Sequence, residues 1–286
     1  MTGRFGKVAV IGTGALGGSV AAALRARGMA ASVCGHDPVN ARAALDAGLI
    51  DSVAEQLSQA IGGADLVVLA APVAVNIALL SDPSNWSSLE AQALVTDVSS
   101  TKLSVVAAAL AGMGAVRGRF VASHPIAGAD RAGPGASRAD LFEGAAVIVC
   151  PTDDSDADAC ERNHALWSAM GARVASMSAQ HHDRLFAEVS HWPHAVAFAL
   201  SAAIGNGPLA DDARRFYGAG LRDTTRVGGS PADLWAGILL DNRGPTLVAA
   251  AAFRQSLDRI ERAIADGDRD ALVSALAEGE RWRTSL

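Results

Sequence analysis

The feature that most constrains the fold is an apolar segment followed by three closely spaced glycines near the N-terminus. Residues 7–11 are mainly apolar and β-branched, which is typical of a strand buried on both faces of a parallel sheet. A G-x-G-x-x-G loop follows at once, and the Ala-rich residues 19–27 have the composition of a helix. This succession of strand, loop and helix is the fingerprint of a dinucleotide-binding βα unit. The residues expected to contact the dinucleotide are Gly12, Thr13, Gly14, Ala15, Leu16 and Gly17.

The loop and the end of the next strand together predict which dinucleotide binds. We expect Gly12 to make the tight turn, Gly14 to admit the pyrophosphate beside the backbone, and Gly17 to let helix and strand pack closely. Asp37 follows the second expected strand, residues 31–35, where a carboxylate accepts hydrogen bonds from the adenosine ribose and repels a 2′-phosphate. The sequence therefore predicts NAD rather than NADP. Asp37 could also cap the helix that follows, and one residue can do both.

Polar residues follow two further strands of the predicted sheet. Residues 64–72 form a buried strand that ends at Pro72, a position that lines the cofactor crevice in such folds. Residues 93–98 form the next strand and lead into Ser100 and Lys102. One interpretation is that Ser99 or Ser100 caps the helix that follows. The functional interpretation is that Ser100 and Lys102 present a hydroxyl and a cation to the same crevice.

His124 lies where an α/β sheet places its ligands. It follows the apolar residues 120–122, the end of an expected strand, and it precedes Pro125 and a Gly-rich loop. Pro125 fixes its own φ and favours an extended conformation at His124, so the imidazole is held in place. Taken alone, the pair is more typical of a loop histidine that caps a turn. The rest of the chain favours a functional histidine.

The second half of the sequence changes character, because strands give way to helices after a short strand at residues 173–176. The sequence predicts an α/β fold with two domains, a Rossmann-type dinucleotide-binding domain at residues 1–178 and an all-helical substrate and dimerisation domain at residues 179–286. Apolar helices after residue 240 suggest a homodimer formed through the C-terminal helices. The expected helices are residues 180–204, 211–217, 232–241, 243–266 and 268–283.

Histidines are concentrated at the start of the helical half. His191 and His194 are three residues apart and share a helix face, and Pro193 is expected to kink this helix. This segment contains neither an H-E-x-x-H pattern nor a nearby cysteine, so no metal is expected. For His181 and His182, packing at a domain interface is as plausible as a functional role.

A Gly-rich segment farther on contains two arginines four residues apart. We expect one of Arg222 and Arg226 to bridge to Asp223 and the other to pair with a ligand carboxylate. Trp235 could wall an apolar pocket or belong to the core.

The overall composition excludes several classes of function. The net charge of −6 and the absence of a Lys/Arg-rich block argue against nucleic-acid binding. The N-terminal apolar run is too short for a signal peptide, and the longest apolar run contains Pro72 and Asn76, so no membrane span is expected. The three cysteines have neither a C-x-x-C pattern nor metal-ligand spacing. They are typical of free thiols in a reducing compartment, so we expect a cytoplasmic protein.

Taken together, these motifs resemble the prephenate/arogenate (cyclohexadienyl) dehydrogenase family of tyrosine biosynthesis. The resemblance runs in order along nearly the whole chain, and two of its motifs are specific, the His-Pro-Ile-Ala-Gly sequence and the Ser-His-x-Pro-His sequence. The matching motifs begin at Gly12, Asp97, His124, Asp140, His182, Ser190 and Arg222, the last of them leading to Trp235.

The resemblance implies an NAD-dependent oxidative decarboxylation of prephenate to 4-hydroxyphenylpyruvate, of arogenate to tyrosine, or of both. It implies that His124 is the catalytic histidine on the ring hydroxyl and that Ser100 supports it. It also implies that His194 contacts the substrate, that Arg226 pairs with a substrate carboxylate, and that Trp235 lines the pocket.

Two other functions compete with this interpretation. A β-hydroxyacid dehydrogenase also joins a Rossmann domain to helices, but it needs a catalytic lysine in the helical part, and Lys102 is the last lysine of this chain. An NAD-sensing regulator would keep the glycines without needing His124, His194 and Arg226 together.

Overall fold

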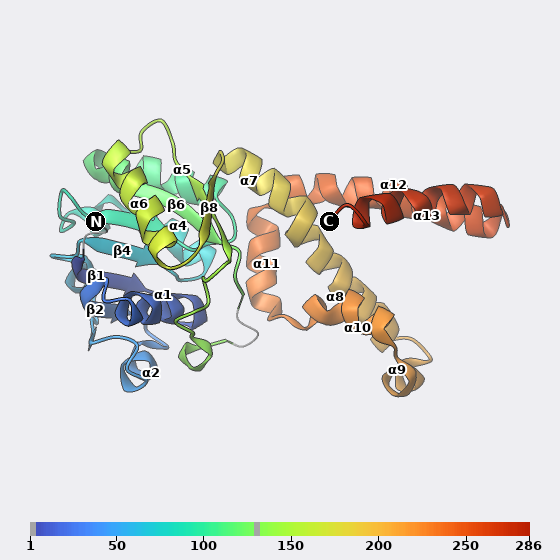
Figure 1. Cartoon of the computed structure of the whole chain (residues 1–286), viewed down its shortest axis with the longest axis horizontal. Helices are drawn as coiled ribbons and strands as arrows, with labels where there is room; N and C mark the ends of the chain where they lie inside the picture. Colours follow the sequence, from blue (N-terminus) through green and yellow to red (C-terminus); the bar gives the residue numbers. More distant parts are fainter. Residues whose placement is uncertain (1–3, 129–131) are drawn as a thin grey trace. The chain divides into compact units, whose positions relative to one another are not determined.

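The computed structural model describes residues 4–128 and 132–286, which fold as two compact units (Figure 1). Unit 1 comprises Met1–Asp183 and Ser230–Asp241, and unit 2 comprises Arg184–Gly229 and Asn242–Leu286. Each unit is described by itself below.

Unit 1 is built on a predominantly parallel sheet. Its strands are β1 (Phe5–Ile11), β2 (Ala30–His36), β3 (Ser52–Val53), β4 (Leu66–Leu69), β5 (Leu94–Asp97), β6 (Phe120–Pro125), β7 (Ala146–Cys150) and β8 (Arg173–Ser176). Within the described residues they form one eight-stranded sheet in the order β3-β2-β1-β4-β5-β6-β7-β8. β1 to β6 are parallel, and β7 runs antiparallel to β6. Since the strand order reverses between β1 and β4, the carboxyl ends of these strands form the edge at which such sheets bind ligands.

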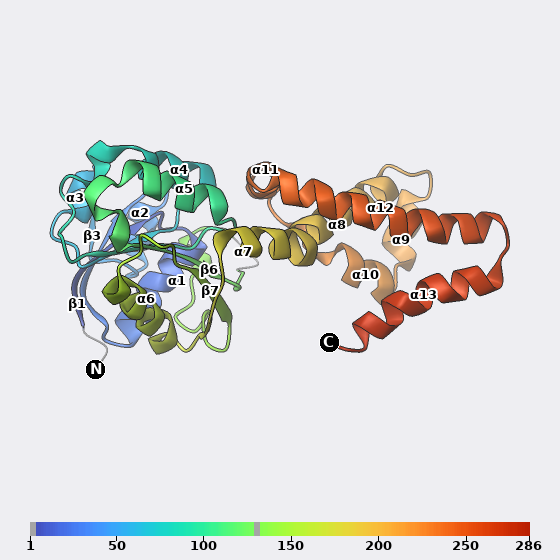
Figure 2. The same cartoon turned by 90° about the horizontal axis from the view of Figure 1, so that it is seen from above.

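Helices cover both faces of this sheet. They are α1 (Ala15–Ala26), α2 (Ala41–Asp46), α3 (Leu57–Ile61), α4 (Val73–Ser81), α5 (Leu103–Gly112) and α6 (Ala157–Ala169), with short 3₁₀ turns η1 (Pro83–Trp86), η2 (Gly114–Arg119) and η3 (Pro134–Ala136). Figure 2 shows α1 and α6 on one face of the sheet and α4 and α5 on the other. The main core lies on the α1/α6 face, where Leu24 and Trp167 pack on alternate residues of the strands and are fully buried.

After residues 184–229, which belong to unit 2, the chain returns to unit 1 at Ser230–Asp241. Helix α11 (Ala232–Asp241) packs against α4, and the Ser104 hydroxyl at the start of α5 donates a hydrogen bond of 2.6 Å to the Asp241 carboxylate. This unit therefore consists of two stretches of sequence separated by 46 residues of unit 2, residues 184–229.

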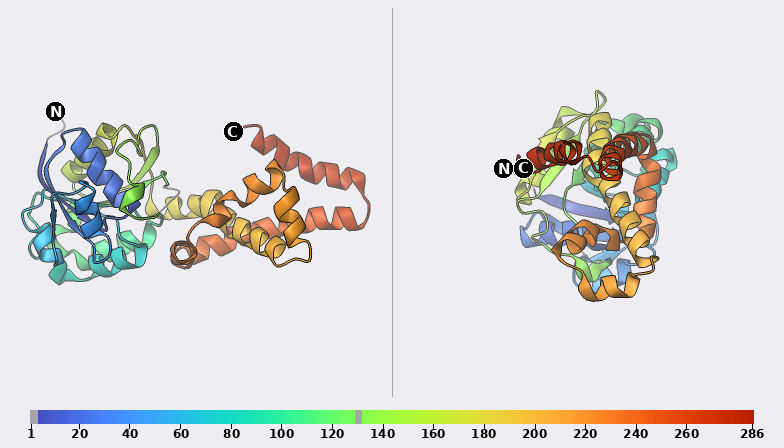
Figure 3. Two further views of the ribbon diagram at one scale, coloured as in Figure 1. Left: turned by 90° about the horizontal axis from the view of Figure 1, so that it is seen from below. Right: turned by 90° about the vertical axis from the view of Figure 1, so that its right-hand side faces the viewer.

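Unit 2 is helical throughout its described residues. Helix α7 (Ala179–Phe186) crosses from unit 1 into it, and a π-helical turn, η4 (Ala187–His191), leads into α8 (Trp192–Gly205). The remaining elements are α9 (Ala210–Phe216), α10 (Ala219–Thr225), the 3₁₀ turn η5 (Arg226–Gly229), α12 (Arg243–Ala265) and α13 (Arg269–Arg283). α12 and α13 form an antiparallel pair, which is clearest in Figure 3, and α8 packs against α10, η5 and α12.

The predicted fold class is confirmed, with two local differences. The helix expected at residues 180–204 is interrupted by the π turn, next to Pro193, which has no N–H to give to the carbonyl of Val189. The segment read as a Gly-rich turn contains α10. All three cysteines are free. Among the described residues, no helix combines the length and apolar character needed to cross a membrane.

Candidate functional site

The glycine loop between β1 and α1 has the shape of a pyrophosphate cradle. Gly12 has φ +91°, and a Cβ there would come within 2.5 Å of the backbone of Ala70. A Cβ at Gly17 would lie 1.9 Å from the carbonyl oxygen of Gly12, so only glycine fits at either position. A Cβ at Gly14, in contrast, would meet open space. In the described chain, the start of α1 carries neither a side-chain cap nor an acidic residue in its first turn, which leaves its N–H groups suited to an anion.

Asp37 ties the end of β2 to this loop. One carboxylate oxygen accepts a hydrogen bond of 2.8 Å from the N–H of Thr13, and the other accepts bonds of 2.9 Å from Val39 and Asn40. Burial by itself raises the pKa of Asp37, but these backbone donors outweigh it and hold the pKa below its ordinary value. The carboxylate is therefore ionised, as ribose binding and rejection of a 2′-phosphate both require. It also organises the turn before α2, but the N-cap of that helix is Asn40, so Asp37 does not cap the helix itself as one interpretation expected.

The segments after β4 and β5 are joined by a buried amide. Asn76 is fully buried and donates hydrogen bonds of 3.0 Å to the Ala71 carbonyl and to the Ser99 hydroxyl. Pro72 is the exposed N-cap of α4, and Ser100 is half-buried. The amide therefore fixes the neighbours of both positions at the carboxyl edge of the sheet.

Lys102 lies in a place that differs from the expected one. Its ammonium is fully buried and donates to the Asp97 carboxylate at 2.5 Å and to the Ser123 carbonyl at 2.7 Å. An ammonium held in this way does not present its charge to the cofactor crevice. Lys102 instead joins the ends of β5 and β6.

Ser123, directly before the candidate catalytic histidine, has all of its polar atoms in hydrogen bonds. Its N–H donates to the second oxygen of Asp97 at 3.0 Å, and its carbonyl accepts from Lys102. Its hydroxyl is bonded to Thr96 at 2.9 Å and accepts from Asn163 at 2.9 Å and Trp167 at 3.0 Å. The backbone that carries His124 is consequently rigid.

His124 lies in β6 near its carboxyl end, 9 % exposed, and contacts a second histidine. Its Nδ1 is 2.8 Å from Nε2 of His182, and the two rings meet edge to face with centroids 5.0 Å apart. Nδ1 of His182 is in turn 2.8 Å from a carboxylate oxygen of Asp183. The sequence did not assign roles to His182 and Asp183, although the pair begins one of the motifs on which the family resemblance rests.

Asp183 also fills the capping role expected of Ser99 or Ser100. Its two carboxylate oxygens accept the N–H groups of Lys102 at 2.8 Å and Leu103 at 2.9 Å, where α5 begins. A cap supplied from about eighty residues along the chain could not be deduced from the local sequence, and for that reason the prediction of a serine cap was wrong.

In unit 2, the π turn gives His191 and His194 different partners. His191 is buried, and its Nδ1 is 2.9 Å from the amide of Asn242 at the start of α12. His194 is half-buried, and its Nδ1 is 2.8 Å from the Ser190 carbonyl. Burial lowers the pKa of His194; the Ser190 hydrogen bond opposes this, and the charge of Arg226 adds to it. His194 and Arg226 are therefore close enough to influence each other, as the expected substrate contacts should be.

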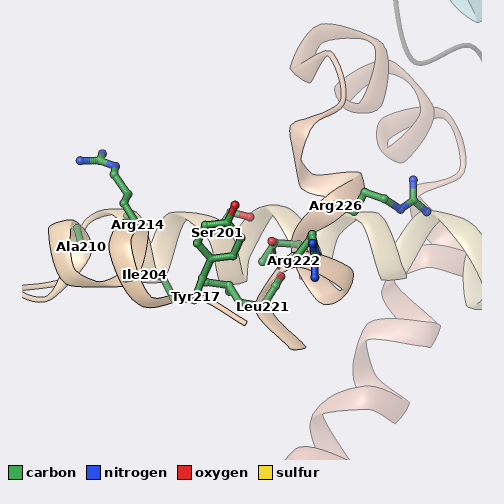
Figure 4. A pocket seen from close by; sticks show the side chains of 11 residues that line it. Ser201, Ile204, Ala210, Arg214, Tyr217, Leu221, Arg222 and Arg226 are labelled. Atoms are coloured by element: carbon green, nitrogen blue, oxygen red, sulfur yellow. Dashed lines mark hydrogen bonds between the residues drawn. The ribbon is translucent and has the colours of Figure 1, made fainter. Parts of the chain in front are cut away.

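Arg226 is brought to α8 by close packing. A Cβ at Gly228 would lie 2.8 Å from the carbonyl of Ala197, so this glycine lets η5 lie against α8. Arg226 borders a hollow of about 430 Å³ between α8, α9 and α10 (Figure 4). In that view Tyr217 and Leu221 lie close to Ser201, whereas the Arg226 guanidinium extends outward. Arg222 is 4.0 Å from Asp223, so it is the arginine with the expected local bridge.

The expected site residues are thus distributed over both units. Unit 1 contains the glycine loop, Asp37, Pro72, Ser100 and His124, all at the carboxyl ends of parallel strands, together with the half-buried Trp235 on α11. Unit 2 contains His194 and Arg226. The part of the chain that the structure describes contains no group of three or more His, Cys, Asp or Glu side chains arranged to hold a metal ion.

Comparison with known proteins identifies the family. Residues 20–176 match the model of the prephenate dehydrogenase nucleotide-binding domain, and residues 178–278 match that of the prephenate dehydrogenase dimerization domain. The chain belongs to the prephenate dehydrogenase family. It is an NAD-dependent dehydrogenase, and the glycine loop, the open position at Gly14 and the ionised Asp37 fit that cofactor.

Individual members of the family match over nearly the whole chain. A cyclohexadienyl dehydrogenase of Zymomonas mobilis is 32 % identical over 290 residues, which cover 99 % of this chain and 96 % of the relative. The structure of Aquifex aeolicus prephenate dehydrogenase with hydroxyphenyl propionate and NAD⁺ is 32 % identical, with a TM-score of 0.87 and 98 % of each chain covered. Synechocystis arogenate dehydrogenase is 26 % identical, with a TM-score of 0.79, and the match covers 98 % of this chain and 99 % of that one.

Proposed function

We propose that this chain oxidises and decarboxylates a cyclohexadienol, prephenate or arogenate or both, in tyrosine biosynthesis. The observation that carries the proposal is His124. It lies near the carboxyl end of β6, at the same sheet edge as the glycine loop, and its ring is held by a buried histidine. A fixed imidazole beside a dinucleotide site is what removal of a hydroxyl proton during hydride transfer requires.

The residues divide the reaction between them. NAD supplies the hydride acceptor when it is bound. The Nε2 atom of His124 takes the proton of the ring hydroxyl as the hydride leaves the same carbon, and Ser100 supports this histidine. The resulting ring ketone is conjugated with the two ring double bonds, which end next to the saturated carbon that bears the carboxylate, so its oxygen can receive the electron pair and a proton. The C–C bond to that carboxylate then breaks, CO₂ departs, and the electron pair completes an aromatic ring, so the overall reaction is irreversible.

Unit 2 contributes the residues proposed to orient the substrate. Arg226 pairs with a substrate carboxylate, and a charge-assisted hydrogen bond of this kind contributes about 1.5–3 kcal/mol. His194 makes a second polar contact, and Trp235 from α11 lines the apolar part of the pocket. The prephenate and arogenate side chains differ by a keto group against an ammonium group, and relatives carrying either name match this chain.

We also propose a homodimer formed through the C-terminal helices, in a reducing, cytoplasmic compartment. Large apolar side chains are exposed on α12 and α13, and this region matches a dimerization-domain model. The free cysteines support the compartment. The exposed apolar residues are Leu247, Val248, Phe253, Leu257, Ile264, Val273, Leu276 and Trp282.

The test is NADH or NADPH formation by the purified protein with prephenate and arogenate in parallel, each with NAD and NADP. We expect turnover of at least one acid, with NAD preferred. The variant His124→Asn should lower kcat with little change in KM, because it removes the base and keeps the binding groups. If neither acid is turned over, the proposed function is wrong; near-normal kcat in His124→Asn would refute the assignment of the base alone.

A further inference from the structure

Two buried residues behind His124 are positioned to decide which of its ring nitrogens carries the proton. We infer that Asp183 and His182 fix the Nδ1–H tautomer of His124 and so keep Nε2 available as the base. Asp183 and His182 are positioning residues in this inference, which rests on the function proposed above. The argument follows the hydrogen bonds outward from Asp183.

Asp183 is an ionised acceptor. One of its oxygens receives the N–H of Lys102 at 2.8 Å and the other receives the N–H of Leu103 at 2.9 Å. These are the first N–H groups of α5, where the helix dipole also favours negative charge. Burial alone raises the pKa of Asp183, but its bonds to His182 and to these two N–H groups outweigh that and lower the pKa below its ordinary value. An ionised carboxylate can only accept, so Nδ1 of His182, at 2.8 Å, must be the donor.

His182 passes this constraint to His124. The His182 side chain is fully buried, and burial is the largest cause of a pKa below the ordinary histidine value, so the ring is neutral. A neutral imidazole that donates through Nδ1 carries its lone pair on Nε2. That atom is 2.8 Å from Nδ1 of His124, which must then be the donor in this second bond. The proton of neutral His124 is thereby placed on Nδ1, and the basic lone pair on Nε2.

The alternative tautomer has a specific cost here. If His124 carried its proton on Nε2, Nδ1 would face the lone pair of His182 at 2.8 Å with no proton between them. To relieve that repulsion, His182 would have to donate through Nε2 and turn its other lone pair to the Asp183 carboxylate. Because Asp183 is 4 % exposed and already tied to the start of α5, it has little freedom to move away. The Nε2–H tautomer of His124 is therefore disfavoured both at the His124–His182 contact and at the His182–Asp183 contact.

The variant Asp183→Asn tests the inference most directly. The Asp183 oxygen that faces Nδ1 of His182 also accepts the N–H of Lys102. An asparagine NH₂ group in its place donates to Nδ1 of His182 and reverses both hydrogen bonds, at the cost of the Lys102 bond, while the amide oxygen still accepts from Leu103. His124 then carries its proton on Nε2 and cannot act as the base. We expect kcat to fall on the order of 10²–10⁴-fold, as when an aspartate that orients a catalytic histidine is replaced by asparagine. KM for NAD should stay within about twofold, because Asp183 is outside the glycine loop.

Two replacements of His182 provide a rescue test that separates positioning from packing. His182→Gln keeps an amide oxygen that can accept from Nδ1 of His124, whereas His182→Phe keeps a ring of similar volume without any acceptor. We expect the glutamine variant to retain at least about tenfold higher kcat than the phenylalanine variant. Asp241→Asn is the matched control, because Asp241 also accepts a hydrogen bond at the start of α5 but lies outside the histidine chain. It should keep wild-type kcat.

The ring nitrogens can be observed without turnover, by ¹⁵N NMR of histidine-labelled protein. Wild type should show the Nδ1–H tautomer for His124, and Asp183→Asn should show the Nε2–H tautomer, with His124→Asn used to assign the signals. An Nε2–H tautomer in wild type would overturn the inference, and so would an unchanged tautomer with unchanged kcat in Asp183→Asn. The proposed function fails separately, through absence of turnover in wild type, and the NMR result remains decisive in that case.

Discussion

The buried Lys102–Asp97 pair makes a quantitative prediction about stability. At 2.5 Å and an effective dielectric constant of ~20, the attraction between the two charges is about 7 kcal/mol, and desolvation of two fully buried ions offsets much of it. Removal of one partner leaves the other charge buried and uncompensated, which costs about 3–5 kcal/mol. For a unit of this size, that loss lowers Tm by roughly 6–20 °C.

The structure ranks the two single variants. Lys102→Met leaves the Asp97 carboxylate with hydrogen bonds from the N–H groups of Ser99 and Ser123, both at 3.0 Å. Asp97→Asn leaves the ammonium with an uncharged amide and the Ser123 carbonyl, so it should be the more damaging change. The double variant removes both charges. Its loss of unfolding free energy should be smaller than the sum of the two single-variant losses by about 2 kcal/mol or more.

The assay is denaturant unfolding of the four proteins in a double-mutant cycle, followed by tryptophan fluorescence and circular dichroism. Additivity of the two losses within about 0.5 kcal/mol would show that the charges do not depend on each other and would refute the reasoning. Single variants that each lose less than about 1 kcal/mol would refute it as well, because a fully buried unpaired charge costs more than that.

Three further predictions concern other parts of the molecule. Gly17→Ala should cost about 1–3 kcal/mol of stability through its clash with the loop carbonyl, whereas Gly14→Ala, which faces open space, should stay within about 1 kcal/mol of wild type. Calorimetry should nevertheless show at least tenfold weaker NAD binding by Gly14→Ala, about 1.4 kcal/mol. Because burial lowers the pKa of His182, the unfolded chain takes up that proton first, so stability should fall as the pH drops below 6.5. His182→Gln should flatten that slope in denaturant midpoints measured between about pH 5 and 8. Arg226→Ala should raise the pKa of His194 in an NMR titration, and an unchanged pKa would show that the arginine charge does not reach the ring.

The elements that were predicted correctly are those whose structure depends mainly on residues close to them in the sequence. The strand, glycine loop and helix at residues 5–26 are confirmed, because turn chemistry and burial pattern there depend on neighbouring residues. The strand at Arg173–Ser176 and the long C-terminal helices are confirmed for the same reason. Helix α10 was missed because Gly218 and Gly220 at its start lower the local helix propensity, which packing against α8 overrides.

The parts of the site that the sequence could not supply are long-range contacts. The ammonium of Lys102 pairs with Asp97, only five residues away in the sequence. Both side chains also form hydrogen bonds to the backbone of Ser123 in the next strand. The carboxylate of Asp183 caps a helix that begins eighty residues earlier. Such pairings follow from the order of strands in the sheet, which no local pattern contains. The position of His124 was predictable, and its partner was not.

The return of the chain at Ser230–Asp241 has a consequence for how unit 1 can be made and divided. Any uninterrupted piece of sequence that contains all of unit 1 also contains residues 184–229 of unit 2. During synthesis, the last helix of unit 1 emerges only after 46 residues of other structure. A fragment that stops at residue 178 would contain every strand of the sheet but would lack both α11 and the carboxylate that caps α5. The nucleotide-binding half of this enzyme should therefore be isolated with residues 179–183 attached and α11 restored, or not separated from its chain.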